Sequence, residues 1–255
     1  MQNKVIFKSI NMKNTIKILA IMIFSSFACH SKPVDNMKFH QYVGLGDLKN
    51  AEEQLKLGID VNCIINEGVT PIMTAALNDQ VAMINLLIKY KADIDRQSGA
   101  GWTALLYAAE YGNLKSLELL IKKGANLNIT LNGGESAVLQ ACFRKHVEAA
   151  EMLINAGAKT GIPTKIGLTE LIVAADLGNL GLVKLLVSKN NNINSINFYG
   201  ESALIRASLR GNSDVVEYLL SQGADRMIKD KFEKTALDWA IENKFDNVKK
   251  LLEKK

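Results

Sequence analysis

A period of 33 residues runs through most of this chain and limits what it can fold into. Glycine marks the period, at Gly68, Gly101, Gly134, Gly167 and Gly200. Thr or Ser follows two positions later, at Thr70, Thr103, Ser136, Thr169, Ser202 and Thr235. Ala and Leu columns keep the same phase, and no insertion or deletion interrupts them. The chain is therefore expected to be a stack of similar units rather than one globular core.

Each unit reads as a turn followed by two helices. Glycine suits the turn because a positive φ angle costs little only for glycine, and the following Thr or Ser suits the N-cap of a helix. Apolar residues at helical spacing in segments such as 114–121 predict a second helix. Gly112 and Gly124 lie where the two helices of one unit should end, as left-handed C-caps do.

The phrase that opens each first helix resembles the Thr-Pro-Leu-His-x-Ala motif of ankyrin repeats. It occurs as TPIMTA, TALLYA, SAVLQA, TELIVA, SALIRA and TALDWA. The resemblance covers about residues 35–255 and implies a mainly α fold, an ankyrin-repeat α-solenoid of stacked helix-turn-helix units with loop fingers. In ankyrins the His bonds between neighbouring loops. Here its position holds Met73, Leu106, Leu139, Ile172, Ile205 and Asp238. We therefore expect weaker cross-linking of the loops.

The repeats predict one elongated domain over residues 36–255. Its seven units are expected at about 36–66, 67–99, 100–132, 133–165, 166–198, 199–231 and 232–255. The first unit lacks the Gly-x-Thr opening, and the last ends in NVKKLLEKK, whose Lys and Glu can face water. Both terminal units are thus expected to act as polar caps, which a solenoid requires.

Residues 1–28 have the layout of a secretory signal peptide, with Met12 as the more natural start. Lys13 and Lys17 form a positive region, and a largely apolar run from Ile16 to Phe24 follows. This run is too short to span a hydrocarbon layer of ~30 Å. The segment is therefore interpreted as an address that is removed from the mature protein.

The segment Ser-Phe-Ala-Cys that ends at Cys29 resembles a bacterial lipobox, in which the Cys is acylated and becomes the new N-terminus. It departs from the family pattern at Ser26, where Leu is usual. Ser26 and Ala28 also suit an ordinary signal peptidase, which would leave Cys29 unmodified. The first alternative predicts a lipoprotein of the bacterial cell envelope, facing the periplasm or the surface, and the second a secreted protein. In both, residues 29–35 are a tether, and membrane contact is expected only through a lipid on Cys29.

The charge of the chain argues against a nucleic-acid partner. The formal net charge is +5, but four lysines and no acidic residue lie in 1–28. The remainder carries 27 basic and 26 acidic residues, so it is nearly neutral. A phosphate-binding function loses its main support.

No residues with catalytic or metal-binding spacing stand out. Of the three histidines, His30 lies in the expected tether, His40 and His146 are far apart in the sequence, and a solenoid brings together only neighbouring units. Cys63 and Cys142 lie more than two units apart, too far for a disulfide. No metal, no cofactor and no enzymatic activity are expected.

In ankyrin proteins the partner usually meets the loop tips and first helices on the concave side. The hot-spot residue types in these places are Trp102, Tyr111, Phe143, Arg144, Phe198, Tyr199 and Arg210. The first four are expected to form one aromatic patch with an arginine beside it. The alternative is that some of these aromatics pack against the next loop and are half-buried.

These observations favour a monomeric, non-catalytic protein–protein interaction module. The predicted role is an envelope-anchored scaffold or inhibitor that binds a partner protein of unknown identity on its concave face. One alternative is a secreted effector that acts on another cell, which acylation of Cys29 would contradict. Another is an enzyme that uses the groove, but no nucleophile–base pair can be assembled for it.

Overall fold

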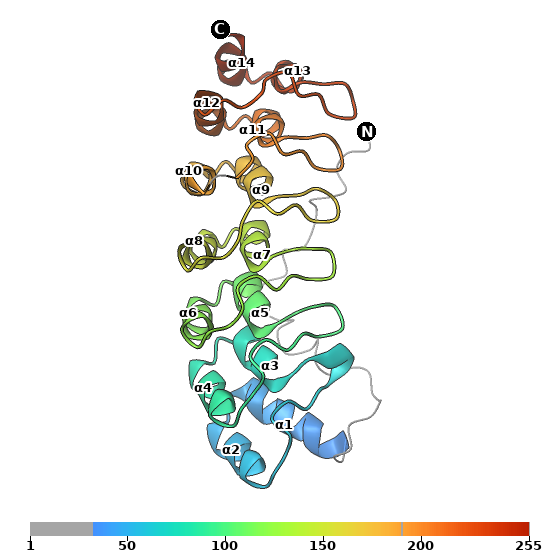
Figure 1. Ribbon diagram of the computed structural model, residues 1–255, viewed down its shortest axis with the longest axis vertical. Coiled ribbons are helices and arrows are strands. Elements are labelled where there is room, and N and C mark those ends of the chain that lie inside the picture. Colours follow the sequence, from blue (N-terminus) through green and yellow to red (C-terminus); the bar gives the residue numbers. More distant parts are fainter. Residues whose placement is uncertain (1–32, 190, 255) are drawn as a thin grey trace.

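The computed structural model describes residues 33–189 and 191–254, which form a stack of paired helices (Figure 1). The first helices of the pairs are α1 (Pro33–Leu45), α3 (Pro71–Leu77), α5 (Ala104–Tyr111), α7 (Ala137–Phe143), α9 (Glu170–Leu177), α11 (Ala203–Arg210) and α13 (Ala236–Glu242). The second helices are α2 (Leu48–Lys56), α4 (Val81–Lys89), α6 (Leu114–Lys122), α8 (Val147–Asn155), α10 (Leu180–Ser188), α12 (Ser213–Ser221) and α14 (Asp246–Glu253). A short 3-10 turn, η1 (Asn66–Gly68), precedes α3. The predicted α-solenoid is confirmed.

The helices lie in two columns, with loops projecting from one side. First helices pack on the first helices of neighbouring pairs, as α9 does on α7 and α11, and second helices pack on second helices. Each segment from a second helix to the next first helix extends away from both columns as a finger (Figure 1). Successive fingers therefore lie one above another and share one side of the molecule with the first helices. We call this side the finger-side face.

The repeat columns of the sequence form the core. The alanine column is fully buried, at Ala75, Ala108, Ala141, Ala174, Ala207 and Ala240. The leucine column is buried as well, at Leu87, Leu120, Leu153, Leu186, Leu219 and Leu252. Small alanines let neighbouring first helices approach closely, and the leucines fill the space between the two columns. The 33-residue period is thus a packing requirement that recurs in every layer.

The Thr and Ser column begins the first helices, as predicted. Side-chain oxygens accept a hydrogen bond from the backbone N–H three residues later at Thr103, Ser136, Thr169, Ser202 and Thr235. Thr70 is the exception, because its hydroxyl makes no such bond and its own N–H donates to Met73 Sδ.

The glycine column has a second cause besides its positive φ angle. At Gly101, with φ +91°, a Cβ would lie 3.0 Å from the Cα of Leu131 in the next finger. At Gly167 it would lie 2.9 Å from the carbonyl oxygen of Ile196. The fingers therefore stack at backbone contact, which any side chain at these positions would obstruct. Glu233, which takes the same position near the C-terminus, adopts φ +59° at a cost that glycine avoids.

The end of the stack is closed by polar groups. Val248 and Leu252 turn inward from α14, whereas Lys250 and Glu253 are exposed. Arg226 of the preceding finger donates through Nη1 to the carbonyl of Leu252, 3.2 Å away, and to that of Lys254. It thereby provides hydrogen-bond donors for carbonyl groups at the C-terminus of α14, which have no partner within the helix.

The predicted signal segment 1–28 and Cys29 lie outside the described residues. Helix α1 begins at Pro33, so the last three residues of the predicted tether 29–35 are helical. Proline suits the first turn of a helix, where its missing N–H is not needed. In the ranges 33–189 and 191–254, no helix combines the length and hydropathy that crossing a membrane requires.

Candidate functional site

The fingers are joined to one another by backbone hydrogen bonds. Each finger ends in a pair of tip residues, and the six pairs are Asn66–Glu67, Gly99–Ala100, Asn132–Gly133, Lys165–Ile166, Phe198–Tyr199 and Lys231–Phe232. From the second pair onward, the backbone N–H of the first residue donates to the carbonyl oxygen of the second residue in the preceding pair. The five N···O distances run from 2.7 Å, between Gly99 and Glu67, to 3.3 Å, between Asn132 and Ala100. The finger tips are one connected ribbon.

This ribbon corrects the expectation of weakly linked loops. Five successive main-chain bonds do not depend on the missing histidines, because they use only the backbone. Asn132 adds a side-chain bond, from Nδ2 to the carbonyl of Gly99 at 3.0 Å. The finger-side face is therefore a fixed surface on which tip side chains have set spacings.

The family histidine is also present once, in the first unit. His40 lies 33 residues before Met73, at the same position of the repeat. Its ring is buried, with Nε2 3.1 Å from the carbonyl oxygen of Cys63 and Nδ1 3.4 Å from the Thr74 hydroxyl. Burial lowers the pKa of His40 to about 4. It is thus a neutral donor that ties α1 to the first finger.

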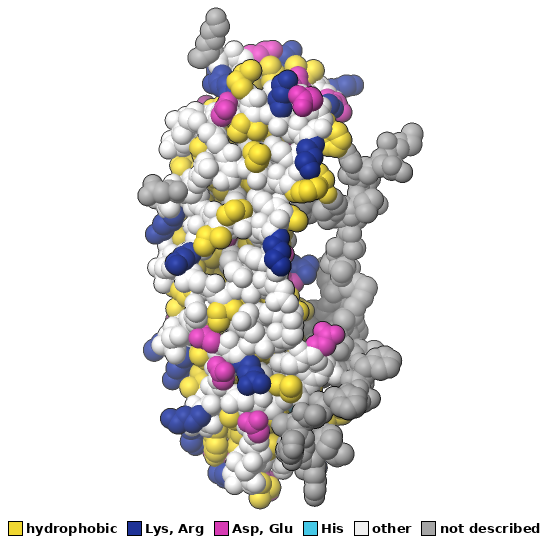
Figure 2. Space-filling view, turned by 45° about the vertical axis from the view of Figure 1, so that its right-hand side comes forward, with side chains coloured by type: hydrophobic (Ala, Val, Ile, Leu, Met, Phe, Trp, Pro, Cys, Tyr) yellow, Lys and Arg dark blue, Asp and Glu magenta, His cyan; other side chains and the backbone are white. Residues whose placement is uncertain are grey.

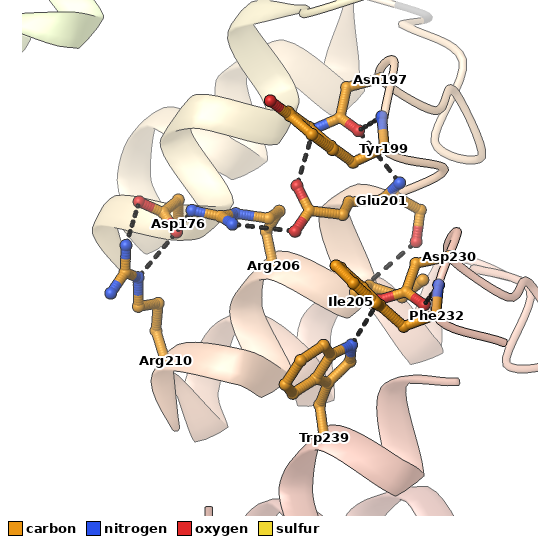
Figure 3. Close-up of polar contacts among 11 residues, drawn as sticks. Asp176, Asn197, Tyr199, Glu201, Ile205, Arg206, Arg210, Asp230, Phe232 and Trp239 are labelled. Atoms are coloured by element: carbon orange, nitrogen blue, oxygen red, sulfur yellow. Dashed lines mark hydrogen bonds and ion pairs between the residues drawn. The ribbon is translucent and has the colours of Figure 1, made fainter. Parts of the chain in front are cut away.

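Ion pairs join the ends of adjacent first helices. Arg144, the C-cap residue of α7, reaches back to Glu110 of α5, with Nη2 2.5 Å from Oε1. Arg210 of α11 reaches Asp176 of α9 in the same way, with Nε 2.8 Å from Oδ1 (Figure 3). The hydrogen bond from the Arg144 guanidinium to Glu110 is also the main cause that raises the pKa of Arg144.

A second arginine makes the α9–α11 junction a network. Arg206 Nη2 lies 2.6 Å from Asp176 Oδ1, and its Nη1 lies 3.0 Å from Glu201 Oε1 (Figure 3). Asn197 Nδ2 donates to the other oxygen of Glu201 at 2.8 Å. These contacts tie a finger base to two first helices and leave each carboxylate with a cationic partner.

The predicted site residues fall into four settings. Phe198 and Tyr199 are exposed at a finger tip, with rings edge to face at 5.4 Å. Arg144 and Arg210 are half-exposed and hold the ion pairs described above. Tyr111, at the end of α5, is exposed, and partial burial raises the pKa of its hydroxyl.

The remaining two, Trp102 and Phe143, are partly buried against the core. Trp102 stacks on Tyr107 of the helix that follows it, with ring centroids 4.7 Å apart. Trp102 is therefore a half-buried aromatic, as the alternative allows, although it packs on the helix of its own unit rather than on the next loop. Burial also raises the pKa of Tyr107.

The possible reactive groups are metal-binding clusters and cysteines. Over the ranges that the structure describes, no cluster of three or more His, Cys, Asp and Glu could hold a metal ion. Cys63 and Cys142 are buried. Burial raises the pKa of the Cys142 thiol, so its reactive thiolate form is disfavoured.

Comparison with known proteins defines the family. The family model described as ankyrin repeats (3 copies) matches residues 39–131, 124–197 and 171–255. The chain belongs to the ankyrin-repeat family. Ankyrin repeats are protein–protein interaction modules, and the fold is a non-catalytic one. A comparison with curated protein sequences finds no match.

Solved ankyrin structures resemble the chain over most of its length. The ankyrin repeat domain of Bcl-3, a member of the IkappaB family, is 26% identical, with a TM-score of 0.73 over 85% of this chain and 97% of that chain. The human ASB11 ankyrin repeat domain is 23% identical, with a TM-score of 0.73 over 85% and 98%. At 23% identity, the match to ASB11 shows that the two chains share a fold and nothing more about function.

A third match has higher identity. It comes from the structure of the predatory endopeptidase Bd0816 from Bdellovibrio bacteriovorus in complex with immunity protein Bd3460. The identity is 35%, with a TM-score of 0.66, over 72% of this chain and 97% of that chain. This relative of the chain is thus known in complex with a protein partner.

Proposed function

We propose that this protein is a non-catalytic inhibitor that binds an endopeptidase and holds it inactive, as an immunity partner. The observation that carries this proposal is the 35% identity to a chain of the endopeptidase–immunity protein complex, over 97% of that chain. The partner would bind on the finger-side face, which is the concave side in ankyrin proteins. There the tip ribbon and the arginine ion pairs support a preformed surface, and preformed surfaces lose less entropy on binding.

The first prediction concerns inhibition. The mature chain is expected to abolish the activity of an endopeptidase related to Bd0816, from the protein's own source organism, at equimolar concentration. Isothermal titration and a peptide-cleavage assay measure affinity and inhibition together. Lys122→Ala is the matched control, because Lys122 is exposed on α6, in the other helix column, and should change neither quantity. An endopeptidase that is neither bound nor slowed would contradict the proposal.

We also propose that the protein is exported and anchored in a bacterial cell envelope through an acylated Cys29. The charged, apolar and small-residue segments before Cys29 support export. An inhibitor anchored in this way would meet endopeptidases that act outside the cytoplasm. The secreted alternative uses the same cleavage site without the lipid.

The second prediction separates these alternatives. Cys29→Ser is expected to move the protein from the membrane fraction to the soluble fraction and to abolish labelling by a fatty-acid analogue. The reason is that acyl chains supply the attachment, at ~0.8 kcal/mol for each buried CH₂ group. Wild-type protein that is found unlabelled and soluble outside the cell would favour plain secretion instead.

A further inference from the structure

We propose that the tips of the last three fingers are the main docking surface, and that they receive a partner surface in which apolar side chains are edged by carboxylates. This inference rests on the proposed function, since it concerns where and how the same partner binds. The three tips are Lys165–Ile166, Phe198–Tyr199 and Lys231–Phe232, which we call the C-terminal tips. The other three pairs are the N-terminal tips.

The two halves of the ribbon differ in chemistry at equivalent positions. The N-terminal tips hold Asn, Gly, Ala and Glu, without a lysine or a large apolar side chain. Each C-terminal tip carries at least one large apolar residue, and these are widely exposed: Ile166 56%, Phe198 59%, Tyr199 38% and Phe232 55%. The repeat itself requires none of them, because the same positions accept glycine and alanine. Large apolar groups that remain exposed at positions where the repeat does not require them are typical of a binding site.

These apolar side chains are held side by side. The backbone N–H of Phe198 donates to the carbonyl oxygen of Ile166 at 2.8 Å, and that of Lys231 donates to the carbonyl oxygen of Tyr199 at 2.9 Å. Adjacent tips are therefore in contact through their backbones. Figure 2 shows hydrophobic side chains beside lysine and arginine side chains over the upper, C-terminal half of the finger side. The exposed groups thus lie on the tips of three successive layers.

Polar side chains at the finger bases fix the shape of two of these tips. Asn197 Oδ1 accepts from the N–H of Tyr199 at 2.8 Å, and Asp230 Oδ1 accepts from the N–H of Phe232 at 2.8 Å (Figure 3). Asp230 is buried, and its other oxygen accepts from Trp239 Nε1 at 2.7 Å. The backbone that carries the Tyr199 and Phe232 rings is therefore held in one conformation, which lowers the conformational entropy lost when these rings bind a partner.

Charge indicates the chemistry of the partner. Lys165 and Lys231 make no ion pair with the residues that the structure describes, and Lys231 Nζ lies 3.3 Å from the ring centroid of Phe198. One cation thus lies over an exposed aromatic ring, and the other belongs to the finger tip on the opposite side of Phe198. Carboxylates on the partner would pair with these lysines, while apolar groups cover the rings between them.

The test uses substitutions that the repeat already accepts. Ile166, Tyr199 and Phe232 occupy the same column as Ala100, so Ile166→Ala/Tyr199→Ala/Phe232→Ala should fold as wild type does. Its melting temperature should fall only slightly, because Phe232 loses one edge-to-face contact with Trp239 and Tyr199 one with Phe198. We expect this variant to bind the endopeptidase at least about 30-fold more weakly, the loss of one or more hot spots. Glu67→Ala, in the same column of the N-terminal tips, is the matched control and should bind as wild type. Equal affinity of the triple variant and wild type would overturn the proposal.

The contribution of Lys165 and Lys231 is tested separately, through the association rate. Lys165→Asn/Lys231→Asn copies the asparagines of the N-terminal tips and should lower the association rate and flatten its dependence on salt, because exposed charges mainly steer encounter. An association rate with unchanged salt dependence would contradict a carboxylate-bearing partner.

A second measurement distinguishes failure of this inference from failure of the proposed function. A photo-crosslinking residue is placed at position 199 or 232, and for comparison at 67 or 100, and is activated in cells that produce the full chain. Crosslinks from 199 and 232 to a peptide with acidic residues beside apolar ones support the docking surface, even when the endopeptidase does not bind. Crosslinks only from 67 and 100, or from none of the four positions, overturn it.

Discussion

Replacing Arg206 with Met is expected to lower the free energy of unfolding by about 3 kcal/mol. The Arg206 side chain is only 12% exposed and lies between Asp176 and Glu201, which are 11% and 13% exposed. Without the guanidinium, two poorly solvated carboxylates face the same space. Removal of one partner from a buried ion pair typically costs ~3–5 kcal/mol. We place this case at the lower end because Arg210 still pairs with Asp176.

The matched control is Arg210→Met, which removes an arginine from the same carboxylate. Arg210 is 42% exposed, and such surface pairs contribute at most about 1 kcal/mol. Urea denaturation followed by circular dichroism measures both variants. Similar losses for the two would show that burial of Arg206 does not decide the effect.

A compensated variant tests the same physical cause. The positions of Asp176, Glu201 and Arg206 are apolar in neighbouring units, where Leu209, Leu168 and Val173 occupy them. Asp176→Leu/Glu201→Leu/Arg206→Val is therefore expected to recover most of the stability that Arg206→Met loses, because no charge is left buried. If the triple variant is less stable than Arg206→Met, the carboxylates contribute more than their pairing.

The sequence predicted the solenoid because its determinants are local and repeated. A hydroxyl at an N-cap acts within one unit, and a turn glycine or a buried alanine meets the same kind of neighbour in every layer, so each copy of the repeat reports the same requirement. The ion pairs are different, since they join residues 34 apart in two units. Glu110–Arg144 and Asp176–Arg210 are themselves 66 residues apart, and this two-unit spacing was a signal that could have revealed them.

The candidate site was only partly predictable for the same reason. Phe198 and Tyr199 stood out as aromatic tips, and the structure places them in the open. Ile166 and Phe232, in the column of Tyr199, were not selected, although comparison with Ala100 marks them. Whether Trp102 would be exposed depended on the direction in which its finger turns onto Tyr107, which no residue pattern states.

Acid is expected to destabilise the protein through His40, by about 2 kcal/mol at pH 5 and about 3 kcal/mol at pH 4. Burial lowers the folded-state pKa of His40 to about 4, whereas an unfolded histidine has a pKa near 6.5. Between these values the unfolded chain binds a proton that the folded chain does not. Stability is therefore complete above pH 6.5 and is lost as the pH falls toward 4. Each pKa unit corresponds to ~1.4 kcal/mol.

The sign follows from the contacts of the ring. Nε2 donates to the Cys63 carbonyl, and Nδ1 faces the Thr74 hydroxyl, so the neutral ring needs only one proton. A second proton would place a charge in the core between α1 and the first finger, with no carboxylate in these contacts to balance it. Because α1 lies at one end of the stack, the loss should begin as local unfolding of the first unit.

Glutamine at position 40 removes the titration and keeps a side-chain N–H that can donate to the Cys63 carbonyl. His40→Gln is therefore expected to be less stable than wild type at pH 7.5 but to lose much less stability between pH 6.5 and pH 5. In this window few carboxylates titrate, since their pKa values usually lie near 4. Urea denaturation at pH 7.5, 6.5 and 5.0 measures the difference. An equal acid dependence in both proteins would place the sensitive group elsewhere, with His146 the next residue to replace, because burial lowers its pKa too.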